Sequence, residues 1–133
     1  MTHLLDTCIC IFLIRHKLQC VRNRFELHVL GSIGISSVTE SELRHGAEKS
    51  SDPVGNHRQL DHLLLALPVL SYDTRCAAYY GKIRARLERV GTPIGSMDLM
   101  IAAHAQSLGL TLVTNNTREF SRVPGLTLED WSL

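Results

Sequence analysis

The feature that most constrains this sequence is a set of four polar residues, each placed where an apolar segment gives way to a helix start or a loop. They are Asp6 after Leu4-Leu5, Glu42 early in the helix after Ile33-Gly34-Ile35-Ser36, Asp98 at the start of residues 98–108, and Asn116 after Leu112-Val113-Thr114. In open parallel α/β sheets, ligands bind outside the carboxyl ends of the strands. The four positions are therefore expected to converge in one crevice.

Three carboxylates in one crevice repel one another unless their pKa values rise or a cation binds between them. Ligand sets made only of oxygen atoms suit magnesium or manganese better than zinc. The pattern therefore predicts a small metal-dependent hydrolase. Asp6, Glu42 and Asp98 are the predicted catalytic and metal-binding residues, and Asn116 is a predicted neighbour that orients them.

Short apolar segments alternate with helical patterns along the whole chain, which favours a parallel α/β sheet covered on both faces. Strands are expected at residues 3–6, 32–36, 69–70, 112–113 and 126–128. Helices are expected at residues 8–14, 18–30, 37–49, 59–67, after Asp73 and at 98–108, with loops at 50–56 and 115–122. No repeat, linker or low-complexity segment interrupts residues 1–133, so one domain is expected.

The net charge is only +1, with 14 Lys and Arg against 13 Asp and Glu. Overall charge therefore does not indicate a nucleic-acid binder, but the basic residues are grouped. Such groups are either solvated helix faces or a rim that attracts phosphates to an acidic pocket. The candidates for contacting the phosphates of a nucleic-acid backbone are Arg15, Arg44, Arg84, Arg86 and Arg118.

Neither a secretory signal nor a membrane span is expected. The apolar residues 8–14 are too few to cross a bilayer and have no basic segment before them. A cytoplasmic location with reduced cysteines is the prediction. The four cysteines lack a second ligand pair at zinc-binding spacing, so they are interpreted as small buried apolar residues.

Other functions that fit the acidic pattern require further sequence features. No glycine-rich phosphate-binding loop is present. A nucleophilic pair of Cys8 and His104 lacks a nearby cation to activate the thiol. A metal-dependent phosphatase, a DNA nuclease and a non-catalytic module that binds RNA or protein remain open as alternatives.

Four segments carry a family resemblance, and they occur in order over almost the whole chain. They are Leu5-Asp6-Thr7-Cys8, residues 35–46 (ISSVTESELRHG), residues 92–105 (TPIGSMDLMIAAHA) and residues 112–120 (LVTNNTREF). Together with the closing Val123-Pro124-Gly125-Leu126, these segments resemble those of PIN-domain ribonucleases. They are most similar to the VapC toxins of bacterial toxin–antitoxin modules.

This resemblance implies a three-layer α/β/α PIN sandwich with a central, mainly parallel sheet. It implies that Asp6, Glu42 and Asp98 hold Mg²⁺ or Mn²⁺ and that the enzyme cleaves structured RNA such as tRNA. A cognate VapB-type antitoxin is the implied partner. A homodimer is also expected, since symmetric dimers are the commonest soluble assembly.

The sequence departs from the family pattern at three places near the expected pocket. Cys8 and Met97 stand where such toxins commonly have Asn. Both replacements remove a polar side chain that can orient a metal ligand or the substrate. Asn116 occupies a position where many PIN domains have a fourth acid, and Glu119 is then the nearest carboxylate. Three acids suffice to hold one metal ion, and the sequence leaves open whether a second ion binds.

Overall fold

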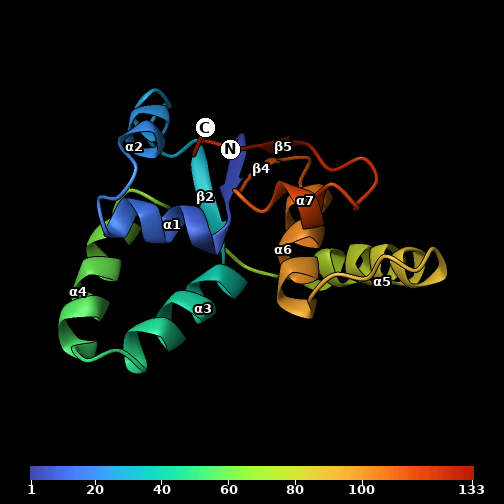
Figure 1. Cartoon of the computed structure of the whole chain (residues 1–133), viewed down its shortest axis with the longest axis horizontal. Coiled ribbons are helices and arrows are strands. Elements are labelled where there is room, and N and C mark those ends of the chain that lie inside the picture. The colour runs from blue at the N-terminus through green and yellow to red at the C-terminus, as the bar shows by residue number, and fades with distance from the viewer.

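All five strands lie in one parallel sheet, in the order β3-β2-β1-β4-β5 (Figure 1). The computed structural model describes the whole chain, residues 1–133. The strands are β1 (His3–Leu5), β2 (Ile33–Ser36), β3 (Val69–Leu70), β4 (Thr111–Val113) and β5 (Leu128–Glu129). Because β1 is the central strand, the residue that follows it, Asp6, leaves the sheet at its middle. The predicted parallel α/β sheet is confirmed.

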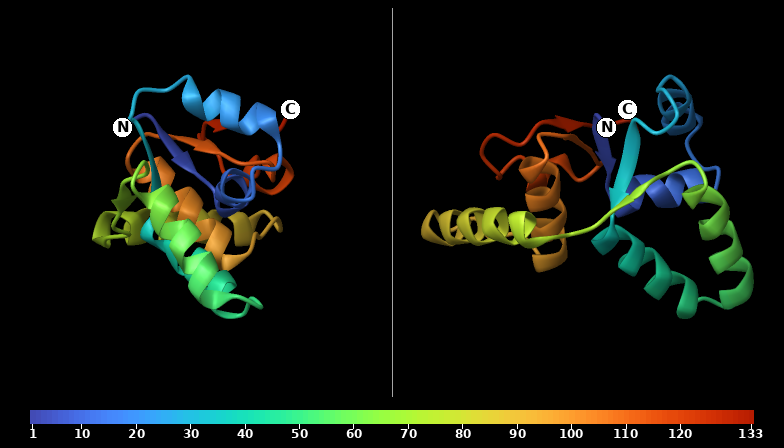
Figure 2. Two further views of the ribbon diagram at one scale, coloured as in Figure 1. Left: turned by 90° about the vertical axis from the view of Figure 1, so that its left-hand side faces the viewer. Right: turned by 180° about the vertical axis from the view of Figure 1, so that it is seen from behind.

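Seven helices pack against this sheet. They are α1 (Thr7–Ile14), α2 (Gln19–Glu26), α3 (Ser37–Glu48), α4 (Pro53–Leu64), α5 (Thr74–Arg89), α6 (Ser96–Ser107) and α7 (Thr117–Phe120). Figure 2, seen from behind, shows α5 and α6 on one side of the sheet and α1, α2 and α4 on the other. The α/β/α layering is therefore as expected.

The alternation of side chains along each strand builds the two cores. Leu4 packs with residues of α5 and α6, whereas its neighbour Leu5 packs with residues of α1 to α4. On β4, Leu112 and Val113 divide between the two cores in the same way. Successive side chains of a strand point to opposite faces, so a fully apolar strand can be buried on both sides. This is why strands of only two or three apolar residues are enough to fill both cores.

The helix expected at residues 18–30 is shorter, because α2 ends at Glu26. Leu27, Val29 and Leu30 continue the apolar pattern but are each about 80% exposed. The prediction failed because periodicity alone does not say whether a face has something to pack against. Gly31, at φ +88°, turns the chain into β2.

Two expected loops contain helices. Residues 50–56 were expected to be irregular, but α4 begins at Pro53, and the Asp52 side chain accepts a hydrogen bond from the Gly55 N–H. An Asp cap followed by Pro at the first helical position is a regular start signal. Within the expected loop 115–122, α7 forms and buries Phe120 completely. No helix of the protein is both long and apolar enough to cross a membrane.

Candidate active site

Asp6 is held rigidly at the carboxyl end of β1. Its carboxylate accepts hydrogen bonds from the Thr7 backbone N–H (2.8 Å, to Oδ1) and from the Thr114 hydroxyl (2.7 Å, to Oδ2). Its own N–H donates to the carbonyl of Val113 over 2.8 Å. Asp6 is the N-cap of α1 and is 5% exposed. An ionised side chain at this depth requires such donors, since an unpaired buried carboxylate is costly.

Glu42 is brought to Asp6 through Thr7. The Thr7 hydroxyl donates to Oε1 of Glu42 over 2.6 Å. The helix α3 that carries Glu42 starts directly after β2, where the Ser36 hydroxyl accepts a hydrogen bond from the Val38 N–H. Because β1 and β2 are parallel neighbours, the helices that follow them start at the same edge of the sheet. Thr7 then fixes how Glu42 approaches that edge.

Asp98 lies in the first turn of α6 and completes the predicted triad. Burial, together with the negative charges of Asp6, Glu119 and Glu42, raises the pKa of Asp98 to about 6. The carboxyl group is within hydrogen-bonding reach of Glu119. The structure thus brings all three predicted acids together. Figure 1 shows that the helices α1, α3 and α6 approach one another at the centre of the molecule.

Asn116 contacts the cluster through a fourth acid, Glu119. Its side-chain amide donates to Oε2 of Glu119 over 3.2 Å, and its backbone N–H donates to the Thr114 hydroxyl over 3.0 Å. The short helix α7 places Asn116 and Glu119 one turn apart. Glu119, considered above only as the nearest carboxylate, therefore belongs to the site.

The four carboxylates have no positively charged partner, since no Lys, Arg or His lies within ion-pair distance of Asp6, Glu42, Asp98 or Glu119. As they stand, no three acidic, histidine or cysteine side chains converge tightly enough to hold a metal ion. Mutual repulsion of the carboxylates accounts for their not converging further. The chemistry of the donors, all carboxylate oxygens, fits magnesium or manganese, and side-chain rotation is needed to close them around an ion.

Cys8 contacts Asp6 but is not a nucleophile. Its thiol donates to Oδ2 of Asp6 over 3.5 Å. Burial, and then the charge of Asp6, raises the pKa of Cys8 to about 11, so the thiol stays neutral at physiological pH. His104 is buried and pairs with the Ser36 hydroxyl over 2.7 Å instead. The nucleophilic pair considered from the sequence is therefore not formed.

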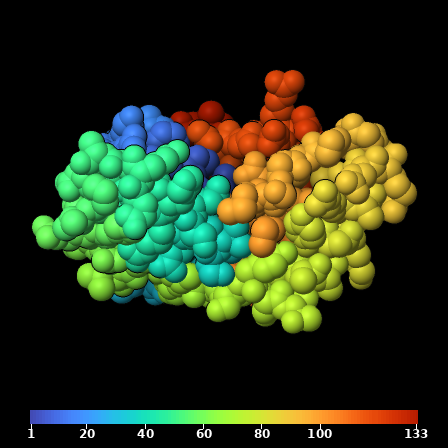
Figure 3. All heavy atoms as spheres, turned by 90° about the horizontal axis from the view of Figure 1, so that it is seen from below, coloured from blue at the N-terminus to red at the C-terminus, as the bar shows by residue number.

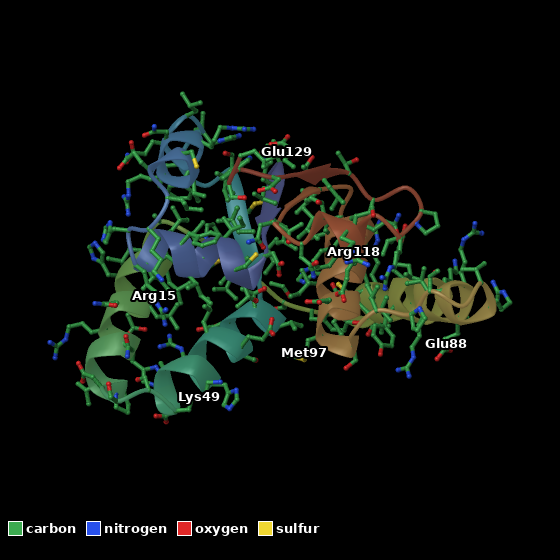
Figure 4. All side chains as sticks on the ribbon, in the orientation of Figure 1. Arg15, Lys49, Glu88, Met97, Arg118 and Glu129 are labelled. Atoms are coloured by element: carbon green, nitrogen blue, oxygen red, sulfur yellow. The ribbon has the colours of Figure 1, made fainter.

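A cavity of about 560 Å³ adjoins the acids between α1, α3 and α4. Thr7 and Glu42 line the end of the cavity that adjoins the acids, its inner end, and Met97 is also among the lining residues. Figure 3, from below, shows α3 and α4 (teal and green) on one side of this face and α5 with the start of α6 (yellow and orange) on the other. Its apolar lining is Ile11, Ile14, Leu43, Leu60 and Met97, and its charged residues include Arg15 and Lys49 (Figure 4).

The five candidate RNA-contacting arginines differ in their surroundings. Arg44 is bound to Asp61 over 2.7 Å and to Glu40 over 3.3 Å, so it ties α3 to α4. Arg84 contacts Tyr80 and Glu88 on its own helix. Arg15, Arg86 and Arg118 are exposed and have no ion pair. The RNA contacts of all five stay predictions.

Sequence reasoning missed Thr7, Thr114 and Glu119 as site residues. The two threonines directly follow or nearly follow strand ends, where a hydroxyl can reach the neighbouring carboxylate. Glu119 lies three residues after Asn116, a spacing that brings two side chains together in one helical turn. Neither signal identifies an active site from the sequence alone, because each is common in chains without one.

Comparison with known proteins decides the family. Residues 3–126 match the PIN domain family. The chain is 53% identical over 129 residues to the tRNA(fMet)-specific endonuclease VapC of Shigella flexneri, with 97% of each chain covered. It is 41% identical over 132 residues to Ribonuclease VapC2 of Rickettsia felis, with 98% of each covered. The chain belongs to the VapC group of PIN-domain ribonucleases.

Solved structures of the VapC group have the same fold. The DNA-bound VapBC complex of Salmonella typhimurium contains a chain that superimposes with a TM-score of 0.94 at 49% identity, covering 98% of both chains. A chain of the VapBC2 complex of Rickettsia felis, bound to a DNA fragment, gives 0.91 at 40% identity, covering 98% of this chain and 99% of that one. The predicted family, the predicted fold and the predicted class of RNA-cleaving hydrolase are confirmed.

Proposed function

We propose that the protein is a Mg²⁺- or Mn²⁺-dependent endoribonuclease, that it acts as the toxin of a toxin–antitoxin module, and that its substrate is structured RNA such as tRNA. The observation that carries this proposal is the cluster of four carboxylates without a positive partner. An acidic pocket of this kind repels a phosphodiester until a cation neutralises it. A divalent cation, when bound, also stabilises the charge that develops on the phosphate during hydrolysis.

The acids of the site are assigned different roles according to how firmly each side chain is held. Asp6, fixed by Thr7 and Thr114, is the rigid ligand for the ion. Burial and the neighbouring carboxylates raise the pKa of Asp98 in the absence of the ion, so its ionisation is expected to accompany cation binding. The Thr7 hydroxyl holds one oxygen of Glu42, which leaves the other to orient the attacking water and accept its proton.

The proposed substrate follows from the relatives. The endonucleases of Shigella flexneri and Salmonella typhimurium, 53% and 50% identical to this chain, are named for specificity toward tRNA(fMet). They match along 97% and 96% of this chain. Structured RNA is recognised largely by its shape and by exposed loop bases, so the cleavage position has to be mapped.

The proposed partner is a VapB-type antitoxin, because the similar solved structures are VapBC complexes. Its docking surface is the cavity between α1, α3 and α4, which offers an apolar lining that runs up to Glu42. An amphipathic helix or extended segment suits such a groove. A basic side chain at its inner end, Arg above all, can form charge-assisted hydrogen bonds to the unpartnered carboxylates. We also propose a homodimer and a cytoplasmic location.

The test is cleavage of total cellular RNA and of purified tRNA with EDTA, Mg²⁺ or Mn²⁺, followed by mapping of the cut ends. Discrete cuts in tRNA that need either cation are expected. DNA and phosphomonoester substrates run in parallel separate the alternative of a DNA nuclease or phosphatase. No turnover on any substrate with Mn²⁺ would leave a binding module instead.

The toxin role has its own test. Expression of the chain alone is expected to arrest growth, and co-expression of the adjacent reading frame is expected to relieve the arrest. Light scattering is expected to report twice the 14.9 kDa chain mass. If the neighbouring product neither binds nor inhibits, the toxin role is wrong although the nuclease activity can stand.

A further inference from the structure

A row of four basic residues runs along one flank of α5. Arg75, Lys82, Arg86 and Arg89 are separated by seven, four and three residues. In an α-helix these spacings return to the same side, so the four side chains form one line. At about 1.5 Å per residue the line is roughly 21 Å long. We name these four residues the basic row.

The basic row has no partner within the protein. All four side chains are exposed, and none of them takes part in an ion pair or a side-chain hydrogen bond. The one acid of α5, Glu88, is held by Arg84 over 3.4 Å. Residues 84 and 88 lie on the opposite flank, because position 84 is half a turn away from position 75. In Figure 4 Glu88 lies along the lower side of α5. The positive charge of the basic row is therefore not neutralised by an acid of the protein.

Beside the row, the outward face of α5 is almost free of bulky side chains. Ala78, Gly81 and Ala85 are exposed there, opposite the buried Cys76, Ile83 and Leu87. A broad partner can approach the helix backbone closely along this face and still be reached by the basic side chains. Figure 1 shows that α5 projects beyond α6, so the rest of the molecule does not block that approach.

A second copy of the chain fits this surface poorly. A two-fold axis that pairs the outward faces of two antiparallel α5 helices brings equivalent flanks together, so one basic row meets the other. In a parallel pair the row meets the flank of Arg84 and Glu88, where the one acid of the helix is already paired. Like charges that face each other across an interface are destabilising. The partner that the row favours is a rod with dense negative charge, which describes the phosphate backbone of a nucleic-acid duplex.

We infer that the basic row of α5 binds the phosphate backbone of a base-paired stem of the RNA substrate, beside the cleavage site. This inference rests on the proposed function. Because α5 packs on α6, whose first turn carries Asp98, a stem bound along α5 delivers its adjoining loop toward the acids. Paired RNA offers phosphates and 2′-hydroxyls across a wide, shallow minor groove, which an uncluttered helix face can enter.

The experiment measures binding of a fluorescently labelled stem-loop RNA and of a single-stranded RNA of equal length, in EDTA so that nothing is cleaved. The test variant is Lys82→Gln/Arg86→Gln. The matched control, Lys17→Gln/Arg58→Gln, removes the same charge from exposed sites outside the row. The test variant is expected to bind the stem-loop about 10–100-fold more weakly near 0.1 M salt, with a salt slope smaller by about 1.5–2. The control is expected to change affinity by less than about threefold.

Three results would overturn the inference: equal weakening by both variants, equal weakening for stem-loop and single strand, or loss of dimerisation in the test variant. Unchanged melting temperatures show that the fold is intact, as expected for exposed positions. Cleavage assays separate the proposed nuclease function from the proposed role of the basic row. If RNA binding depends on the row but no RNA is cleaved, the proposed function alone is rejected. If the test variant cleaves RNA as wild type does, the inference alone is rejected.

Discussion

Thr7 connects two of the acids, since its hydroxyl donates to Glu42 over 2.6 Å while its backbone N–H donates to Asp6 over 2.8 Å. One residue in the first turn of α1 therefore sets the position of a carboxylate that follows β1 and of one carried by α3. Only the backbone contact is available to any residue type. The contact to Glu42 depends on the hydroxyl.

Removal of that hydroxyl is expected to impair catalysis more than folding. Thr7→Val keeps the shape and the backbone contact but leaves Glu42 unheld, and loss of such supporting contacts typically costs about 10–100-fold in activity. Thr7→Ser restores the donor and is expected to recover most of kcat. Steady-state cleavage of tRNA with melting temperatures alongside checks this. Equal activity of the Val and Ser variants would show that the hydroxyl has no role in positioning.

Asn116 is expected to act through Glu119 rather than on the ion directly. Because its amide donates to Oε2 of Glu119, Asn116→Ala frees one carboxylate and is expected to lower activity less than loss of Asp6 does. Asn116→Asp adds a negative charge to the site and is expected to tighten Mg²⁺ binding. Calorimetry measures both. Weaker Mg²⁺ binding by the Asp variant would contradict the assignment.

Without metal, the acids are expected to destabilise the fold. The pKa of Asp98 in the folded protein, about 6, lies above its unfolded value, so its ionised form opposes folding at neutral pH. As pH falls through 6 toward the unfolded value, this effect disappears and wild-type stability gains relative to Asp98→Asn. Above pH 7 in EDTA, Asp98→Asn is expected to melt no lower than wild type. A large fall in its melting temperature would indicate a structural role for the carboxylate.

His104 is expected to give the opposite pH dependence. Burial lowers its pKa below 6.5, although Asp73 acts to raise it; its other close contacts are the Ser36 hydroxyl and the edge-on Tyr72 ring. A lowered pKa means that its stabilising contribution is present above pH 6.5 and is lost as pH falls below 6.5, where only the unfolded state takes up the proton. Melting temperatures from pH 7.5 to 5 are expected to fall more for wild type than for His104→Gln. Parallel curves would contradict this.

The sequence predicted the parts of the fold that depend on chain-local chemistry. Short apolar strands followed by a polar residue such as Asp6 predict both a parallel sheet and its ligand-binding edge, because ligands bind outside the carboxyl ends of parallel strands. The prediction of a helix over residues 18–30 was too long for a different reason. Leu27, Val29 and Leu30 have an apolar pattern but nothing to pack against, and that depends on tertiary structure.

The sequence predicted three acids of the site but not the residues that hold them in place. Asp6 and Asp98 are recognisable because an acid at a strand or helix end needs an explanation. Thr114 is recognisable only once β4 is known to lie beside β1, because its hydroxyl reaches Asp6 across 108 residues of sequence. Glu119 depends on α7, a helix of four residues that is too short to show a periodic pattern.

The central claim is that the acidic cluster binds a divalent cation and that this binding drives RNA cleavage. Its most direct test measures Mn²⁺ binding and Mn²⁺-dependent tRNA cleavage in the same preparations of wild type, Asp98→Asn and the exposed-acid control Glu48→Gln. Asp98→Asn is expected to lose at least about tenfold in Mn²⁺ affinity and to lose cleavage, with an unchanged circular dichroism spectrum. The control is expected to match wild type in both measurements. Cleavage by Asp98→Asn at the wild-type rate would contradict the account.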